Sequence, residues 1–65
     1  MRLKELRKRC NFTLKELSEK TGINLVQLSD YERGKLKLEN MTLKNAVKLA
    51  VALDCRPEDF LDIKI

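Results

Sequence analysis

The chain has 65 residues, of which 43% are apolar and 37% charged, with two Gly and one Pro. This composition is typical of one small folded domain and argues against disorder, and so small a core leaves little room for a deep substrate cavity. The formal net charge is +4, and all of the excess lies in residues 1–35, which carry nine Lys or Arg against five acids. That distribution suits a polyanionic partner, although the same value is common on soluble surfaces.

Several classes of function find no support in the sequence. There is no His, and Cys10 and Cys55 stand far apart, so we expect two free structural thiols and neither a metal nor another cofactor. Without a glycine-rich phosphate loop or paired carboxylates, no residue can be given a catalytic role, so we expect no enzyme and no small-molecule ligand. The charged opening residues and the lack of a long apolar run predict a cytoplasmic protein without a membrane segment.

The first predicted helix covers about residues 2–9. Leu3, Leu6 and Cys10 recur at the spacing of one helix face and form an apolar stripe. Asn11 follows the stripe, and Asn tolerates the left-handed conformation that often ends a helix. We therefore predict that this helix ends just before Asn11.

The second predicted helix has clear start and stop signals. Thr13 is a favourable N-cap, and Glu16 stands three residues later, where it completes a capping box. Gly22 can take the positive φ that stops a helix, so the helix should end at Thr21.

The third predicted helix covers residues 24–33 and starts only two residues after the second one ends. Asn24 is its N-cap, and Gln27 is placed to reach back to that cap from the N3 position. Gly34 closes the helix, and residues 35–41 form a loop. Two capped starts this close together predict a rigid turn between the second and third helices.

The fourth predicted helix runs from about Thr42 to Leu53 and is expected to be the most buried element. Its expected apolar face and the residues that widen it are Leu43, Ala46, Val47, Ala50, Leu53, Leu49 and Val51. Pro57 suits a first helical position, which predicts a short fifth helix over residues 57–61, followed by a tail over 62–65.

As a set, these features resemble the lambda-repressor-like helix-turn-helix family, also called the Xre/Cro family. The matching stretches are Leu6-Arg7, Phe12 to Ser18, Thr21 to Ile23, Leu28 to Gly34 and Leu49 to Leu53. The resemblance spans nearly the whole chain, from about Leu3 to Leu61. It implies an all-α, compact five-helix fold in a single domain over residues 1–65, with the helix-turn-helix motif at about 14–33.

The inner residues of the motif have physical reasons of their own. Ser18 is small where two helices cross closely, and Leu28 and Tyr31 hold the third helix to the core. Glu32 lies only about 40° around the helix from Leu28, so it faces inward and needs a partner. The resemblance implies that this partner is Arg7, in a structural ion pair. The alternative is that Glu32 is a solvated surface charge.

The outer residues of the third helix are the candidates for reading DNA. In the family, the base-reading positions match Leu25, Val26, Ser29 and Asp30. The aliphatic pair could contact thymine methyl groups, Ser29 could bond either kind of base edge, and Asp30 could accept from a cytosine amine. Leu25 could instead simply pack at the start of the helix. The candidate contacts to the DNA backbone are Thr13, Lys15, Asn24, Arg33, Lys35 and Lys37.

One position at the start of the second helix departs from the family pattern. Gln is frequent there and touches the DNA backbone, whereas this chain has Leu14, which we expect to pack beside Leu17 and Thr21.

We therefore expect a small transcriptional regulator that binds double-stranded DNA with the helix over 24–33 in the major groove, acting as a repressor. A homodimer is expected, because one helix this short is not selective enough alone. The fifth helix, 57–61, or the tail, 62–65, could form the dimer interface, or these residues could simply complete the core. The alternative function is an antitoxin-like or adaptor module that uses the same helix face to bind protein.

Overall fold

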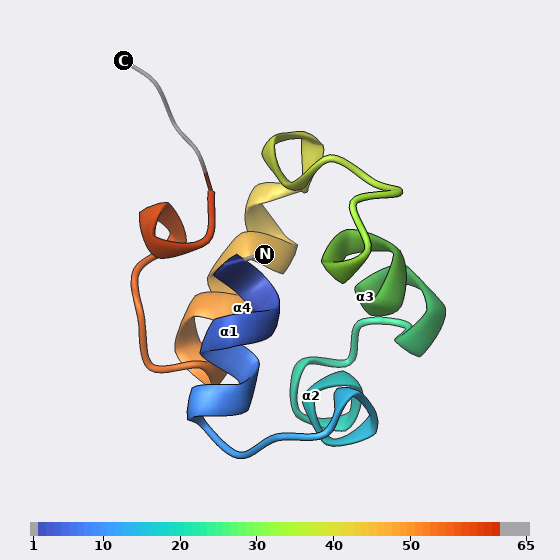
Figure 1. Cartoon of the computed structure of the whole chain (residues 1–65). Coiled ribbons are helices and arrows are strands. Elements are labelled where there is room, and N and C mark those ends of the chain that lie inside the picture. Colours follow the sequence, from blue (N-terminus) through green and yellow to red (C-terminus); the bar gives the residue numbers. More distant parts are fainter. Residues whose placement is uncertain (1, 62–65) are drawn as a thin grey trace.

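The computed structural model describes residues 2–61, which form four α-helices and two short 3-10 helices (Figure 1). In chain order these elements are α1 (Arg2–Arg9), α2 (Leu14–Thr21), α3 (Leu25–Glu32), η1 (Leu38–Asn40), α4 (Leu43–Ala52) and η2 (Pro57–Asp59). Within this part of the chain there is no strand, in agreement with the all-α expectation. No helix among the described residues is long and apolar enough to span a lipid bilayer.

The fifth α-helix predicted over residues 57–61 is wrong, because this segment holds only the 3-10 helix η2. The N–H of Phe60 donates to the Pro57 carbonyl at 3.2 Å, and the Asp59 carboxylate accepts from the Arg56 N–H at 3.0 Å. The residues between Pro57 and Leu61 suffice for one turn, and 3-10 geometry is used in such short pieces. The expected loop over 35–41 likewise contains a short 3-10 helix, η1.

The ends of α1 and α2 follow the predicted signals. Asn11 has φ 59° and Gly22 has φ 72°, so both take the left-handed conformation after a helix. At the start of α2, the Thr13 hydroxyl accepts from the Glu16 N–H at 3.1 Å, and the Glu16 carboxylate accepts from the Thr13 N–H at 2.9 Å. The predicted capping box is therefore confirmed.

The capping box expected at the start of α3 does not form. The Asn24 side-chain oxygen accepts from the Val26 and Gln27 N–H groups at 2.8 and 3.4 Å, as an N-cap should. The Gln27 amide does not reach back to the cap; instead its nitrogen donates to the Tyr31 hydroxyl at 3.5 Å. A partner one turn ahead on the same helix face competes with the cap for this side chain.

The core is built from all four α-helices. Each contributes one fully buried leucine: Leu3 from α1, Leu17 from α2, Leu28 from α3 and Leu49 from α4. Around this centre, α2 lies beside both α3 and α4, α1 lies beside α3, and η2 lies beside α4 (Figure 1). Phe60 is also buried in this cluster, so the segment after α4 completes the core.

The predicted burial of α4 is only partly correct. Ala46, Leu49, Ala50 and Leu53 are buried, but the remaining apolar side chains of the predicted face are exposed. The exposed ones are Leu43, Val47 and Val51. Apolar residues occupy more of the circumference of α4 than its neighbours α2 and η2 can cover, so part of the stripe faces outward.

Both cysteines are free thiols of intermediate burial. The Cys10 sulfur donates to the Leu53 carbonyl at 3.5 Å, and burial raises the pKa of the Cys55 thiol. The thiols are thus part of the packing between the first helix and the end of α4.

Candidate nucleic-acid interface

The turn between α2 and α3 is held by buried and half-buried side-chain hydrogen bonds. The Ser18 hydroxyl donates to the Ile23 carbonyl at 2.6 Å. The Thr21 hydroxyl donates to the Leu17 carbonyl at 2.8 Å and accepts from the Ile23 N–H at 3.2 Å. With Gly22 in the left-handed conformation, these bonds fix the direction in which α3 leaves α2.

The far end of α3 is anchored by an ion pair. The Arg7 Nε and Nη2 atoms donate to the two carboxylate oxygens of Glu32, at 2.6 and 3.1 Å, while Nη1 donates to the Phe12 carbonyl at 2.8 Å. The side chains of Arg7 and Glu32 are only 12% and 7% exposed. The hydrogen bonds to Glu32 raise the pKa of Arg7, so the guanidinium stays charged. α3 is therefore fixed at both ends.

A concavity of about 580 Å³ lies between the start of α2 and the outer face of α3. It is lined by Thr13, Leu14, Lys15, Leu25, Val26, Ser29, Asp30 and Arg33. All four candidate base-reading residues are in this set, and so are three of the six candidate backbone contacts, which makes seven of ten. The fold thus brings most of the sequence-predicted site into one surface.

The centre of this surface is apolar and open. Val26 is 67% exposed and Leu25 is 42% exposed, so Leu25 does not pack into the core. Ser29 and Asp30 follow on the same helix and are half-buried. The surface therefore presents two aliphatic side chains beside a hydroxyl and a carboxylate.

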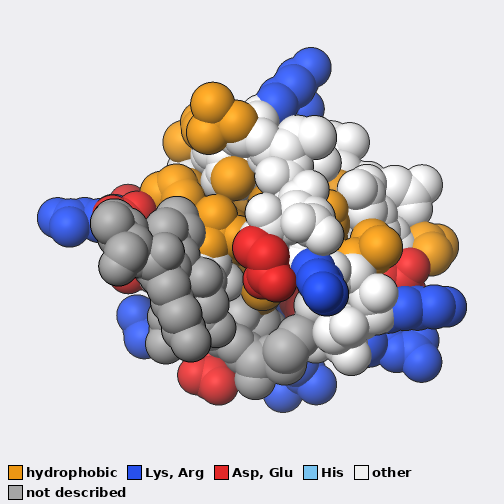
Figure 2. Space-filling view, turned by 90° about the horizontal axis from the view of Figure 1, so that it is seen from above, with side chains coloured by type: hydrophobic (Ala, Val, Ile, Leu, Met, Phe, Trp, Pro, Cys, Tyr) orange, Lys and Arg blue, Asp and Glu red, His pale blue; other side chains and the backbone are white. Residues whose placement is uncertain are grey.

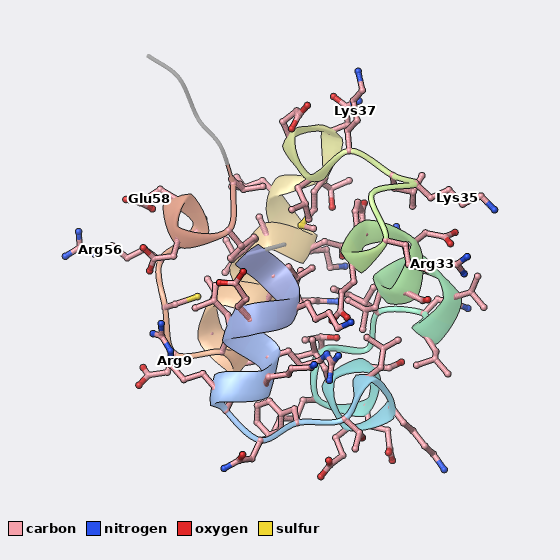
Figure 3. All side chains as sticks on the ribbon, viewed as in Figure 1. Arg9, Arg33, Lys35, Lys37, Arg56 and Glu58 are labelled. Carbon is pink, nitrogen blue, oxygen red and sulfur yellow. The ribbon has the colours of Figure 1, made fainter. Side chains whose placement is uncertain are left out.

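The other three candidate residues lie outside the lining of the concavity. Asn24 uses its side-chain oxygen to cap α3. Lys35 and Lys37 are exposed in the loop after α3. Figure 3 shows Arg33 and Lys35 projecting from the α3 side, Lys37 projecting farther away near η1, and Arg56 on the opposite side of the molecule. Positive charge at the α3 side is therefore carried by Arg33 and Lys35 in particular.

Leu14 is a lining residue that the sequence analysis placed only in the core. It packs partly against the hydrophobic core and also borders the concavity. The sequence did hold a signal for this position, because Leu14 stands between Thr13 and Lys15, which are both candidate contacts to the DNA backbone. Leu14 extends the apolar area formed by Leu25 and Val26.

Comparison with known proteins agrees with this geometry. Residues 2–64 match the family described as the Cro/C1-type HTH DNA-binding domain. The chain belongs to this family. As a Cro/C1-type domain it is a DNA-binding helix-turn-helix domain, which confirms the resemblance found in its motifs. The concavity lies on the two helices that form the helix-turn-helix.

A curated relative supports the same assignment. The Cro/C1-type chain is 44% identical over 61 residues to the SPbeta prophage-derived uncharacterized HTH-type transcriptional regulator YopS of Bacillus subtilis (strain 168). The match covers 94% of this chain and 80% of the relative. No solved structure gives a significant match.

Proposed function

We propose that the protein is a transcriptional repressor that binds double-stranded DNA as a homodimer and places α3 in the major groove. The proposal treats residues 1–65 as one helix-turn-helix domain with its motif at about 14–33, acting in the cytoplasm where its DNA target lies. The family assignment and the relative named as a transcriptional regulator support the regulatory role.

The observation that carries the proposal is the concavity shared by α2 and α3. Its lining combines the outer face of α3 with the capped start of α2, so base contacts and backbone contacts can be made together. α3 has eight residues, a length of about 12 Å, which matches the width of the major groove. The Arg7–Glu32 pair and the bonded turn hold this helix rigid, so little order is lost on binding.

The proposed contacts divide by chemistry. Thr13, Lys15, Arg33 and Lys35 would bind phosphates, together with the free N–H groups at the start of α2. The further backbone candidates are Asn24 and Lys37. About three to four phosphates in each half-site would make the affinity fall steeply as salt is added.

The base contacts favour a particular kind of sequence. Leu25 and Val26 would contact thymine methyl groups, and Ser29 can bond either kind of base edge. Asp30 would accept a hydrogen bond from a cytosine amine, although its charge also repels nearby phosphates. We therefore expect sites with thymines at the positions facing Val26, rather than guanine-rich sites.

Two copies of this domain would bind two half-sites related by two-fold symmetry, with centres about 34 Å apart. Two segments were expected to form the dimer interface. In the first, 57–61, Phe60 is buried in the core of its own chain and is not available to a partner. The tail over 62–65 lies outside the described residues.

The proposed function is tested by selecting bound sites from a library of random duplex DNA. We expect enrichment of a palindrome whose two halves are one helical turn apart, with thymine at fixed positions. Repression is tested by placing the enriched site in a promoter and measuring reporter output, which should fall when the protein is made. A library without enrichment at low salt would contradict DNA recognition.

A second candidate function is an antitoxin-like or adaptor module that binds protein on the same α3 face. The exposure of Leu25 and Val26 beside Leu14 favours it, because an apolar surface fits a protein groove as well as it fits thymine methyl groups. The two functions differ in their response to charge. Removing Lys35 and Arg33 together should weaken DNA binding strongly, whereas binding that these changes leave intact would favour the protein partner.

A further inference from the structure

One acidic side chain lines the concavity between α2 and α3 without a partner. Asp30 stands there in the company of Lys15 and Arg33. It is half-buried, and within residues 2–61 its carboxylate makes no hydrogen bond and no ion pair. In Figure 2 the α3 side lies at the right, as in Figure 1, and an acidic side chain stands between hydrophobic and basic ones at that edge. A carboxylate on a surface that receives a polyanion weakens binding unless the bound molecule gives it a hydrogen-bond donor.

The major groove of DNA offers such donors on two bases. They are the N4 amine of cytosine and the N6 amine of adenine. In adenine the amine stands beside N7, an acceptor that repels a carboxylate, whereas cytosine presents no acceptor of its own in this groove. Asp30 therefore favours cytosine, as the proposed function already expects. The atoms beside the cytosine amine then decide what else this part of α3 reads.

The side chain that shares this face of α3 with Asp30 is aliphatic. Val26 precedes Asp30 by four residues, so the Cβ atoms of the two residues are about 5–6 Å apart. Val26 is exposed and lines the same concavity. Val26 contacts a methyl group at about 4 Å, and the Asp30 carboxylate accepts from an amine at about 2.9 Å. Both side chains can therefore reach neighbouring atoms of one base.

One pyrimidine carries the groups that fit both side chains. Thymine has a methyl group at C5, but the neighbouring O4 is an acceptor and repels the carboxylate. Cytosine has the amine at C4 but only a hydrogen at C5, so Val26 gains little apolar contact. Cytosine methylated at C5 carries the methyl group and the amine on adjacent ring atoms. This modified base matches Val26 and Asp30 better than either unmodified pyrimidine does.

We propose that Val26 and Asp30 together read one 5-methylcytosine in each half-site, so that the protein prefers methylated DNA to unmethylated DNA. This preference rests on the function proposed above, because it requires α3 in the major groove. In unmodified DNA the same position takes thymine, which satisfies Val26 alone, or cytosine, which satisfies Asp30 alone. Burial of one methyl group against an aliphatic side chain should strengthen binding about fourfold.

The test begins with two selections of bound sites, one from a random duplex library and one from the same library with every cytosine methylated at C5. The most enriched site is then made with cytosine, 5-methylcytosine, thymine or uracil at each pyrimidine position of one half-site, and affinity is measured by fluorescence anisotropy. At one position, 5-methylcytosine should bind about fourfold more tightly than cytosine. It should bind at least about tenfold more tightly than thymine, which lacks the amine. Uracil, which lacks both groups, should bind most weakly.

Two variants assign the two contacts. Val26→Ala should reduce the advantage of 5-methylcytosine over cytosine to less than about twofold, and should keep the preference for cytosine over uracil. Asp30→Asn can donate from its amide to O4, so it should lose the preference for 5-methylcytosine over thymine and keep that for thymine over uracil. The matched control is Val51→Ala, the same substitution at a similarly exposed valine of α4 outside the concavity. It should change none of these ratios.

Three results would overturn the reading of 5-methylcytosine. They are equal affinity for cytosine and 5-methylcytosine at every position, a methyl effect that survives Val26→Ala, and a methyl effect at a different position from the amine effect. The last result would mean that Val26 and Asp30 read two neighbouring bases. Each of these leaves the DNA function in place, because the protein still binds a selected site. Failure of both libraries to yield a bound site would instead remove the DNA function, and the preference for methylated DNA with it.

Discussion

Arg7 in the first helix and Glu32 at the end of α3 form a two-point ion pair that joins residues 25 positions apart in the sequence. Because both side chains are nearly buried, the pair holds the last turn of the candidate recognition helix against the body of the domain. The rigidity of this candidate helix thus depends on a contact at its inner side.

Replacing Glu32 by Ala should leave the Arg7 guanidinium buried without its counter-charge. Removing one partner of a buried pair costs about 3–5 kcal/mol, a large part of the roughly 3–10 kcal/mol expected for a domain of this size. The melting temperature should fall by at least about 10 °C in a calorimetric or circular-dichroism melt. Glu19→Ala, at an exposed position of α2, is the control and should change little. An unchanged melting curve for Glu32→Ala would show that the Arg7–Glu32 pair does not stabilise the domain.

Acid should weaken the start of α2. The hydrogen bonds from Thr13 lower the pKa of Glu16, so the folded state binds this proton less tightly than the unfolded state does. The contribution of Glu16 is therefore complete above the ordinary glutamate pKa and is lost as the pH falls through the lowered folded value. Urea unfolding at several acidic pH values should show a shallower pH dependence for Glu16→Gln. Identical slopes for the two proteins would contradict the capping role.

Gly22→Ala should destabilise the domain through the backbone alone. A Cβ at this position would meet nothing within 4 Å, so no side chain is displaced, but φ is 72°. An L-residue in this conformation costs about 1–2 kcal/mol, and Asn tolerates it better. Urea midpoints should therefore rank the unmodified protein above Gly22→Asn, and that variant above Gly22→Ala. If the Asn and Ala variants lost equal stability, the cause would be a steric clash, which the structure does not contain.

Salt dependence should locate the phosphate contacts. Each phosphate contact that is removed lowers the slope of log affinity against log salt by about 0.9. Arg33→Ala should do so in fluorescence anisotropy titrations with a labelled duplex. Arg56→Ala removes the same charge from the opposite side of the molecule (Figure 3) and should leave the slope unchanged. If the two variants changed the slope equally, only net charge would matter, and the assigned surface would be wrong.

The parts of the fold with local signals could be predicted from the sequence. The caps at Thr13 and Asn24 and the stops at Asn11 and Gly22 depend on residues within one turn, and they gave the first three helices with bounds close to the observed ones. The fifth helix was wrong because Pro57 suits the start of an α-helix and of a 3-10 helix equally. A sequence pattern does not separate the two when only one turn forms.

The remaining differences between the predicted and the observed structure depend on which side chains and helices lie close together in the folded domain. Val47 and Val51 continue the apolar pattern of α4, but burial depends on how much of the helix its neighbours cover. Gln27 had a cap within reach, yet it bonds to the Tyr31 hydroxyl. For the candidate site, helical geometry placed Val26, Ser29 and Asp30 on one face, while their meeting with Thr13 and Lys15 required the angle between α2 and α3.

The central claim is that α3 and the start of α2 meet DNA. It is tested most directly by recording backbone amide chemical shifts of the full chain while duplex DNA is added. We predict that the largest changes fall on the amides of Thr13, Lys15, Val26, Ser29 and Arg33, with small changes at Lys48 and Arg56. Changes centred on α4 or η2, with α3 unaffected, would contradict the account.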